Sequence, residues 1–142
     1  MSKKTLILLL SAAAVLAAVI LISPDNKDKI QPENTAVSAS TAAERIDYFA
    51  SHGWEVEEIS GKDIVIPSVF STDYEEYVEI QDRQGLPLRS CSGRGGKLYV
   101  YQVKNYSPDH RKMLAELIVC DDTVAASLVY SEDGGSLRMS VV

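Results

Sequence analysis

The strongest constraint on this chain is a run of nineteen uncharged residues at positions 5–23, TLILLLSAAAVLAAVILIS. As an α-helix rising about 1.5 Å per residue, it would be about 28 Å long, close to the ~30 Å hydrocarbon core of a bilayer. Lys3 and Lys4 precede the run, as in signal peptides and signal anchors. The run therefore predicts a membrane or targeting segment, and a globular core must come from the rest of the chain.

Retention of this segment is favoured over cleavage. A cleaved signal peptide usually has an apolar region of about 7–15 residues followed by a site with small residues. Here the run ends in Leu21-Ile22-Ser23-Pro24, which is a poor cleavage site, so we expect a single-pass signal anchor over residues 1–23. The alternative is secretion after cleavage. Because such segments usually export the residues on their C-terminal side, we expect the C-terminal part to be extracytoplasmic.

The remaining chain divides into a polar linker and one small domain. Residues 24–40, PDNKDKIQPENTAVSAS, contain too few apolar residues to bury a core, which predicts a flexible linker. Residues 41–142 are enough for one domain. From position 41 onward, ten Lys and Arg stand against seventeen Asp and Glu, a balance of −7. This charge disfavours nucleic acid and anionic lipid as partners, since both attract positive charge.

The start of the domain predicts a helix followed by a strand. Thr41 and Glu44 fit a capping box, and Gly53 suits the left-handed position after a helix, so we expect a helix over residues 42–52. Trp54 and Val56 then alternate with glutamates, as in a half-buried strand. We therefore interpret Trp54, the only tryptophan, as an anchor of the core.

Later segments complete an α+β pattern. We expect a turn or bulge at 60–63, an extended segment at 64–67, a helix from 70 to 84, a loop at 86–96 and strands at 97–106, 112–120 and 124–130. Short turns between the last three strands predict an antiparallel meander. The order α-β-α-β-β-β predicts two helices on one face of a roughly four-stranded antiparallel sheet. The tail at 137–142 could add an edge strand.

Few side chains could carry out catalysis. His110 follows Asp109 in the sequence SPDH, and serines are numerous, so a small hydrolase using Asp109, His110 and a serine is one alternative. The same four residues are also typical of a turn, and the sequence contains no G-x-S-x-G motif. Glu75 and Glu79 share a helix face, which is more typical of a solvated acidic surface than of a cation site. No pattern predicts a metal or a cofactor.

Cys91 and Cys120 both lie in the domain. Outside the cytoplasm they could form a disulfide that closes a loop of about thirty residues and stabilises the fold by about 3–4 kcal/mol. In a reducing compartment they would be buried apolar residues or reactive thiols. Their spacing is not that of a metal site.

Tyrosines form a second group of interest. Tyr99, Tyr101 and Tyr106 lie in one predicted strand and its exit, and tyrosine is common at protein interfaces. Tyrosine also has high β-propensity, so a structural role is favoured over an interaction surface made by these three residues.

Two segments, RIDYFASHGWEV (45–56) and YVYQVKNY (99–106), resemble a bacterial family of small domains of unknown function that come after an N-terminal membrane segment. The shared features are an Arg-x-x-Tyr helix, a Gly-Trp pair, a helix ending in Gln-Gly, here Gln84-Gly85, and a Tyr-x-Val-x-Asn-Tyr strand. Ala125-Ala126-Ser127 depart from the glycines expected in the C-terminal strand. The resemblance implies an extracytoplasmic α+β domain and assigns no activity or catalytic residues.

These observations predict a non-enzymatic, membrane-anchored binding or interaction module of a bacterial envelope, with an envelope protein or a cell-wall polymer as its partner. The property that matters most is the uncovered face of the sheet. An apolar, concave face would indicate a ligand or partner, because such surfaces are usually buried in a complex.

Overall fold

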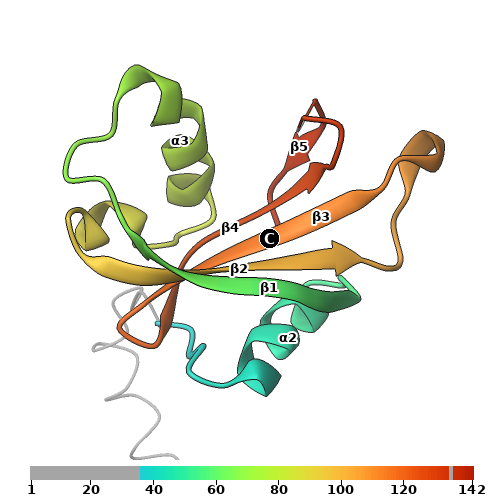
Figure 1. The fold of residues 1–142 in the computed structure, drawn as a ribbon, viewed down its shortest axis with the longest axis horizontal. Coiled ribbons are helices and arrows are strands. Elements are labelled where there is room, and N and C mark those ends of the chain that lie inside the picture. The colour runs from blue at the N-terminus through green and yellow to red at the C-terminus, as the bar shows by residue number, and fades with distance from the viewer. Residues whose placement is uncertain (1–35, 135) are drawn as a thin grey trace, which may run out of the picture. The chain divides into compact units, whose positions relative to one another are not determined.

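A computed structural model describes residues 36–134 and 136–142, which form an α+β domain. Its single sheet has five antiparallel strands in the order β1-β2-β3-β4-β5 (Figure 1). The strands are β1 (Val56–Val65), β2 (Gly95–Val103), β3 (Met113–Cys120), β4 (Thr123–Ser131) and β5 (Arg138–Met139). The helices are α2 (Ala42–Ser51), before β1, and α3 (Glu75–Arg83), between β1 and β2. The expected element order is confirmed, and the short β5 makes the sheet five-stranded rather than four-stranded.

β1 continues through the segment where the sequence predicts a turn or bulge. Its register with β2 shifts between Glu58 and Ser60, which is a β-bulge, and pairing then resumes to the end of the strand. Gly61 pairs with Tyr99, and a Cβ atom at Gly61 would lie 2.9 Å from the Tyr99 ring. The glycine therefore lets the aromatic ring lie across the strand.

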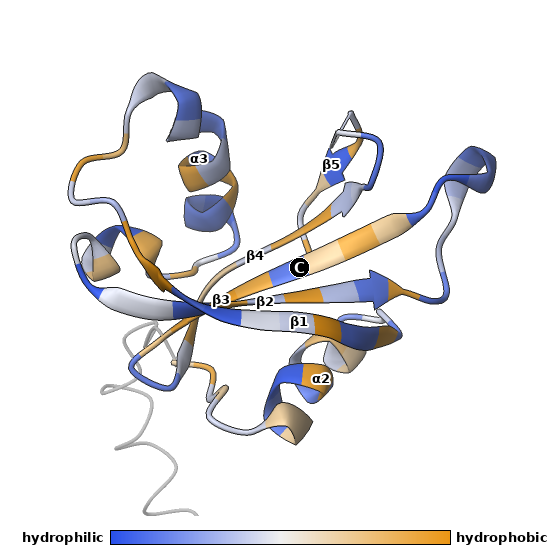
Figure 2. Ribbon diagram, viewed as in Figure 1, coloured by the Kyte–Doolittle hydropathy of each residue, from blue (hydrophilic) through white to orange (hydrophobic). Residues whose placement is uncertain are grey.

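Helices α2 and α3 cover opposite faces of the sheet, so the prediction of two helices on one face is wrong (Figure 1). On one face, Phe49 of α2 belongs to a cluster with Leu117. On the other, Val78 of α3 belongs to a cluster with Ala126. The physical reason lies in β4, which is buried at every position from 124 to 129. A strand that is apolar on both faces must be covered on both, and β3 also carries apolar residues along its length (Figure 2).

The first helix begins at the predicted N-cap with one of the two hydrogen bonds of a capping box, because the Glu44 carboxylate accepts from the Ser40 hydroxyl at 3.1 Å instead of from the Thr41 N–H. The Glu44 N–H donates to the Thr41 hydroxyl oxygen at 3.2 Å, and α2 begins directly after Thr41. Its buried face consists of Arg45, Tyr48 and Phe49. The Arg45 aliphatic stem can pack against the sheet while its guanidinium keeps polar contacts, which is why an arginine is tolerated on this face.

The edge of β4 is completed by side chains of α3 and of Gln84, the residue after it. Ser127 pairs with β3 on one side, but β5 pairs only with Val129 and Tyr130, so the other side of Ser127 has no strand beside it. Instead, the Ser127 N–H donates to Gln81 Oε1 at 2.8 Å, and Gln81 Nε2 donates to the Ser127 carbonyl oxygen at 2.9 Å. Gln84 Nε2 also donates to that carbonyl, at 3.0 Å. The Gln81 side-chain amide thus forms the two backbone hydrogen bonds that a neighbouring strand would otherwise form with Ser127.

The globular part begins before residue 41. The Ala39 N–H donates to the Asp122 carbonyl oxygen at 2.8 Å, and Ala39 is buried, so the end of the expected linker 24–40 packs on the turn between β3 and β4. The expected signal anchor at residues 1–23 lies outside the described residues. Within the two described ranges, neither length nor apolarity would allow any helix to span a bilayer.

Candidate functional site

A groove of about 620 Å³ lies beside α3, on the face of the sheet opposite α2. Its floor consists of Leu98 on β2, Glu116 and Ile118 on β3, and Leu128 and Tyr130 on β4. These residues share one face because Leu98 pairs with Ile118, Glu116 pairs with Leu128, and alternate residues of a strand point to the same side. The groove is therefore the part of this face that α3 leaves open.

Large apolar side chains are exposed at the rim of the groove. Val65, the last residue of β1, is 75% exposed, and Tyr74, just before α3, is 49% exposed. Both line the groove, and Val69, in the loop between them, is 82% exposed. Exposed apolar residues around a concave surface are typical of a binding site.

Glu116 places a carboxylate on the otherwise largely apolar floor. Its cross-strand neighbours are Val100 on β2 and Leu128 on β4, so neither adjacent strand supplies a charged partner. Burial raises the pKa of Glu116 above its ordinary value, whereas the Tyr77 hydroxyl and the Arg138 guanidinium act in the opposite direction. The net rise shows that the site stabilises the charged carboxylate less well than water does.

The Tyr77 hydroxyl, from α3, is enclosed close to Glu116. Burial, followed by the Glu116 charge, raises the pKa of Tyr77 well above its ordinary value. The hydroxyl acts on the Glu116 carboxylate as a hydrogen-bond donor does, although this contact falls short of full hydrogen-bond geometry, and the hydroxyl has no other partner in the described part of the chain. A ligand that donated a hydrogen bond to the phenolic oxygen would add to this contact.

Charged groups of the groove are mainly acidic. Asp73 and Glu132 line it together with Glu116, and the one lysine or arginine in its described lining is Arg138. The Arg138 guanidinium lies 3.8 Å from the Glu76 carboxylate, so it already interacts with an acidic side chain. The electrostatic environment therefore favours a cationic or hydrogen-bond-donating ligand over an anionic one.

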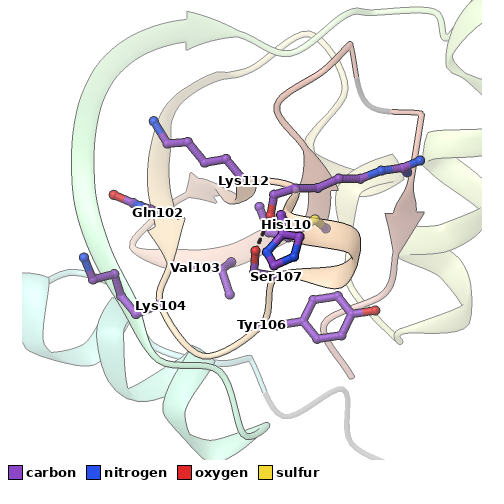
Figure 3. A pocket seen from close by; sticks show the side chains of 9 residues that line it. Gln102, Val103, Lys104, Tyr106, Ser107, His110 and Lys112 are labelled. Carbon is purple, nitrogen blue, oxygen red and sulfur yellow. Dashed lines mark hydrogen bonds between the residues drawn. The ribbon is translucent and has the colours of Figure 1, made fainter.

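The residues considered for hydrolysis lie elsewhere, at the turn between β2 and β3 (Figure 3). His110 and Ser107 line an open depression of about 300 Å³. The Ser107 hydroxyl donates to the Arg111 carbonyl oxygen at 2.7 Å. Among the residues of the described ranges, no hydrogen bond joins His110 to Asp109 or to a serine. The nucleophile–base contact that defines such an enzyme is therefore not assembled in this structure.

The three tyrosines considered as an interaction surface lie on the α2 side of the domain. Tyr101 is fully buried, with its ring centroid 5.0 Å from that of Phe49. Tyr99 is half-buried under the Arg45 guanidinium, which lies 3.9 Å from its ring centroid. Only Tyr106 is exposed. The structure thus places these residues mainly in packing, and they do not line the groove.

Trp54 joins the core to the C-terminal segment. It is half-buried and packs against the cluster on the α2 side, and its indole N–H donates to the Val141 carbonyl oxygen at 2.9 Å. Its ring lies edge-on to Tyr106, with 5.8 Å between centroids. In addition, Asn105 Nδ2 donates to the Gly53 carbonyl oxygen at 2.8 Å. Members of the Gly-Trp and Asn-Tyr motifs therefore contact one another and hold the end of α2 against β2.

Cys91 and Cys120 are free thiols in the structure, and both are buried. They belong to the same cluster on the α3 side, and their sulfur atoms lie within hydrogen-bonding reach. Burial, and then the neighbouring Cys120 thiol, raise the pKa of Cys91 to about 11. The fold thus brings together two residues that are distant in sequence, and a disulfide between them stays a prediction.

Sequence reasoning missed the groove residues Tyr77, Glu116, Tyr130 and Arg138. One signal was available, because Glu116 interrupts the apolar strand KMLAELIVC at a position where its neighbours are buried or half-buried. The other three could not be connected with it before the strands and α3 were placed. Among the described residues, no three His, Cys, Asp or Glu side chains are close enough together to hold a metal ion.

Comparison with protein-family models, with curated proteins and with solved structures finds no match for this chain. The resemblance based on the Arg-x-x-Tyr, Gly-Trp and Tyr-x-Val-x-Asn-Tyr motifs therefore stays a prediction. The candidate site rests on the geometry of the groove itself.

Proposed function

We propose that this chain is a membrane-anchored, extracytoplasmic binding domain that holds a partner in the groove beside α3. The observation that carries the proposal is the combination of an exposed apolar rim, at Val65 and Tyr74, with an enclosed carboxylate at Glu116. Binding sites usually combine apolar surface with a few polar groups that fix the orientation of the ligand.

The location and the partner class are inferred from the sequence. The apolar run at 5–23 is the proposed anchor, and export of the residues after it would place the domain in the cell envelope. Of the two partner classes, the apolar rim favours an envelope protein over a cell-wall polymer, because a polysaccharide offers mainly polar hydroxyl groups to Val65 and Tyr74. The acidic balance of the domain disfavours nucleic acid.

A binding role without catalysis is favoured over the hydrolase alternative. The Asp109 and His110 pair lies at an exposed turn, and Ser107 donates to backbone rather than to His110. In the groove, Glu116 and Tyr77 could hold a ligand, yet no serine or cysteine nucleophile is paired with a base there among the described residues. Recognition requires only the features that are present.

Site-specific photocrosslinking in membranes that contain the full chain tests the proposal. A benzoylphenylalanine replaces Tyr74 at the groove rim, and the matched control replaces Ile46, which is 37% exposed on α2. We expect a protein adduct from position 74 that disappears when Leu98→Trp fills the groove. Absence of an adduct at position 74, equal adducts from position 46, or adducts that survive Leu98→Trp would each contradict the proposed site.

A further inference from the structure

We infer that the groove binds an apolar peptide segment of a partner protein that carries one basic side chain, and that its cationic group binds between Glu116 and Tyr77. This inference rests on the proposed function and adds the chemistry of the partner. It is based on the incomplete interactions of Glu116 and Tyr77 within the domain, and on the shape and polarity of the surrounding surface.

Glu116 forms no close ion pair with another described residue. Its neighbours on β2 and β4, Val100 and Leu128, are apolar. Arg138 is the basic residue whose charge acts on Glu116, but its guanidinium also lies 3.8 Å from Glu76. A carboxylate in partly desolvated surroundings gains more from an incoming cation than an exposed carboxylate does.

The Tyr77 hydroxyl further limits which chemical group of the ligand can bind beside Glu116. This enclosed hydroxyl acts on the neighbouring Glu116 carboxylate without reaching full hydrogen-bond geometry, so the phenolic oxygen is available to accept a hydrogen bond from the ligand. A ligand carboxylate or phosphate would place a second negative charge against Glu116, and a carbonyl group would leave Glu116 unpaired. A lysine ammonium has three donors and an arginine guanidinium five, so either can donate to the Glu116 carboxylate and the Tyr77 hydroxyl oxygen together.

The surroundings of this pair fit an apolar peptide. Leu98 and Leu128 lie on the floor, and Val65 and Tyr74 lie at the rim, so aliphatic or aromatic residues flanking the basic one would be buried. The volume of about 620 Å³ is in the range of ligand sites, but the groove is an open trough rather than a closed chamber. A small molecule usually needs enclosure on most sides, whereas a peptide chain can enter and leave an open groove.

Binding should depend on pH because the cation favours the ionised carboxylate. The titratable and charged groups that line the groove with Glu116 come from α3, β4 and the residue after it, β5 and the turn before α3. They are Tyr77, Tyr130, Glu132, Arg138 and Asp73. Tyr77 and Tyr130 stay neutral in the relevant range, because burial raises the pKa of each. Affinity should therefore fall as the pH is lowered through the raised pKa of Glu116.

Peptide selection on the full chain in lipid nanodiscs tests the inference. A displayed library of random nonapeptides is selected on the wild-type protein, with the Leu98→Trp variant as counter-selection. A retained peptide is synthesised as a fluorescent probe, together with an analogue in which norleucine replaces its basic residue. Dissociation constants are measured for the wild type, Glu116→Gln, Tyr77→Phe and Glu79→Gln. The last is the matched control, since Glu79 is an exposed glutamate of α3 that does not line the groove.

We expect retained peptides to share a lysine or arginine among apolar residues. Glu116→Gln should weaken probe binding by about tenfold and remove its pH dependence, since it removes a charge-assisted hydrogen bond. Tyr77→Phe should weaken binding less, norleucine should act like Glu116→Gln, and Glu79→Gln should change the constant by less than about twofold. Retained peptides without a basic residue, or equal binding to Glu116→Gln, would overturn the inference while leaving the groove as a site. Failure to recover any peptide that distinguishes the wild type from Leu98→Trp would overturn the proposed function as well.

Discussion

Replacing Gln81 tests whether one side chain completes the edge of the sheet. Gln81 is fully buried, and its amide pairs with both backbone groups of Ser127. The Gln81→Met variant keeps the length and nearly the volume of the side chain but removes its hydrogen-bonding groups. Packing should therefore change little, because volume-conserving substitutions cost less than about 1.5 kcal/mol.

The magnitude depends on which Ser127 groups lose every partner. The Ser127 carbonyl oxygen keeps its hydrogen bond from Gln84 Nε2 at 3.0 Å. Loss of the second hydrogen bond to this oxygen, from Gln81, therefore costs only the net free energy of one hydrogen bond, about 0.5–1.5 kcal/mol. The Ser127 N–H keeps no partner, and an unsatisfied buried donor costs about 1–3 kcal/mol. Gln81→Met should therefore lower the free energy of unfolding by about 1.5–4.5 kcal/mol.

Denaturant unfolding followed by the fluorescence of Trp54, the only tryptophan, measures this loss. Gln102→Met is the matched control, since Gln102 is half-buried on β2 and makes no side-chain hydrogen bond within the described ranges. It should change the free energy of unfolding by less than about 0.5 kcal/mol. In the Gln81→Met variant, the Ser127 amide should also lose protection from hydrogen exchange. A loss no larger than that of the control, with Ser127 still protected, would refute the reasoning.

Three further outcomes are expected. Trp54→Ala should cost about 3–5 kcal/mol of unfolding free energy; unchanged stability with loss of a partner would instead identify Trp54 as a binding residue. In exported protein Cys91 and Cys120 should form a disulfide worth about 3–4 kcal/mol, and alkylation of both thiols in such a sample would rule the bond out. Because the folded protein raises the pKa of Glu116, it binds that proton more tightly than the unfolded chain, so ionisation opposes folding as the pH rises through this pKa. Glu116→Gln should thus be more stable than the wild type at neutral pH, and the difference should vanish in acid; thermal unfolding at several pH values would show whether the gap closes.

The Glu116 prediction also separates binding from stability. A carboxylate that opposes folding is retained most readily when it has another use, and such groups cluster at functional sites. If Glu116→Gln stabilises the domain and also weakens peptide binding, the same desolvation explains both effects. The domain would then have a lower free energy of unfolding because it keeps the charged Glu116 carboxylate at a position that a partner can reach.

Of the two central residues of the candidate site, Glu116 could be predicted from the sequence and Tyr77 could not. Glu116 is visible as a charge inside an apolar strand, and an inspection of KMLAELIVC for such a position would have found it. Tyr77 could not be assigned, because it lies in a helix whose covered face depends on where α3 packs. The tyrosines at 99 and 101 were considered for an interface, yet Arg45 and Phe49 of α2 cover them. Strand periodicity shows which residues share a face, but not which helix covers that face.

The sequence by itself determined the local elements of this protein. Thr41 and Glu44 start α2, Gly53 comes after it, and alternation and short turns produce the antiparallel meander, because each of these depends on residues a few positions apart. Tertiary structure alone decided which face each helix covers, that Gln81 meets Ser127, and that Tyr77 meets Glu116. Those contacts join residues about forty positions apart, and they arise only when the two faces of β3 and β4 are buried by different helices. The groove is the part of one face that α3 leaves open.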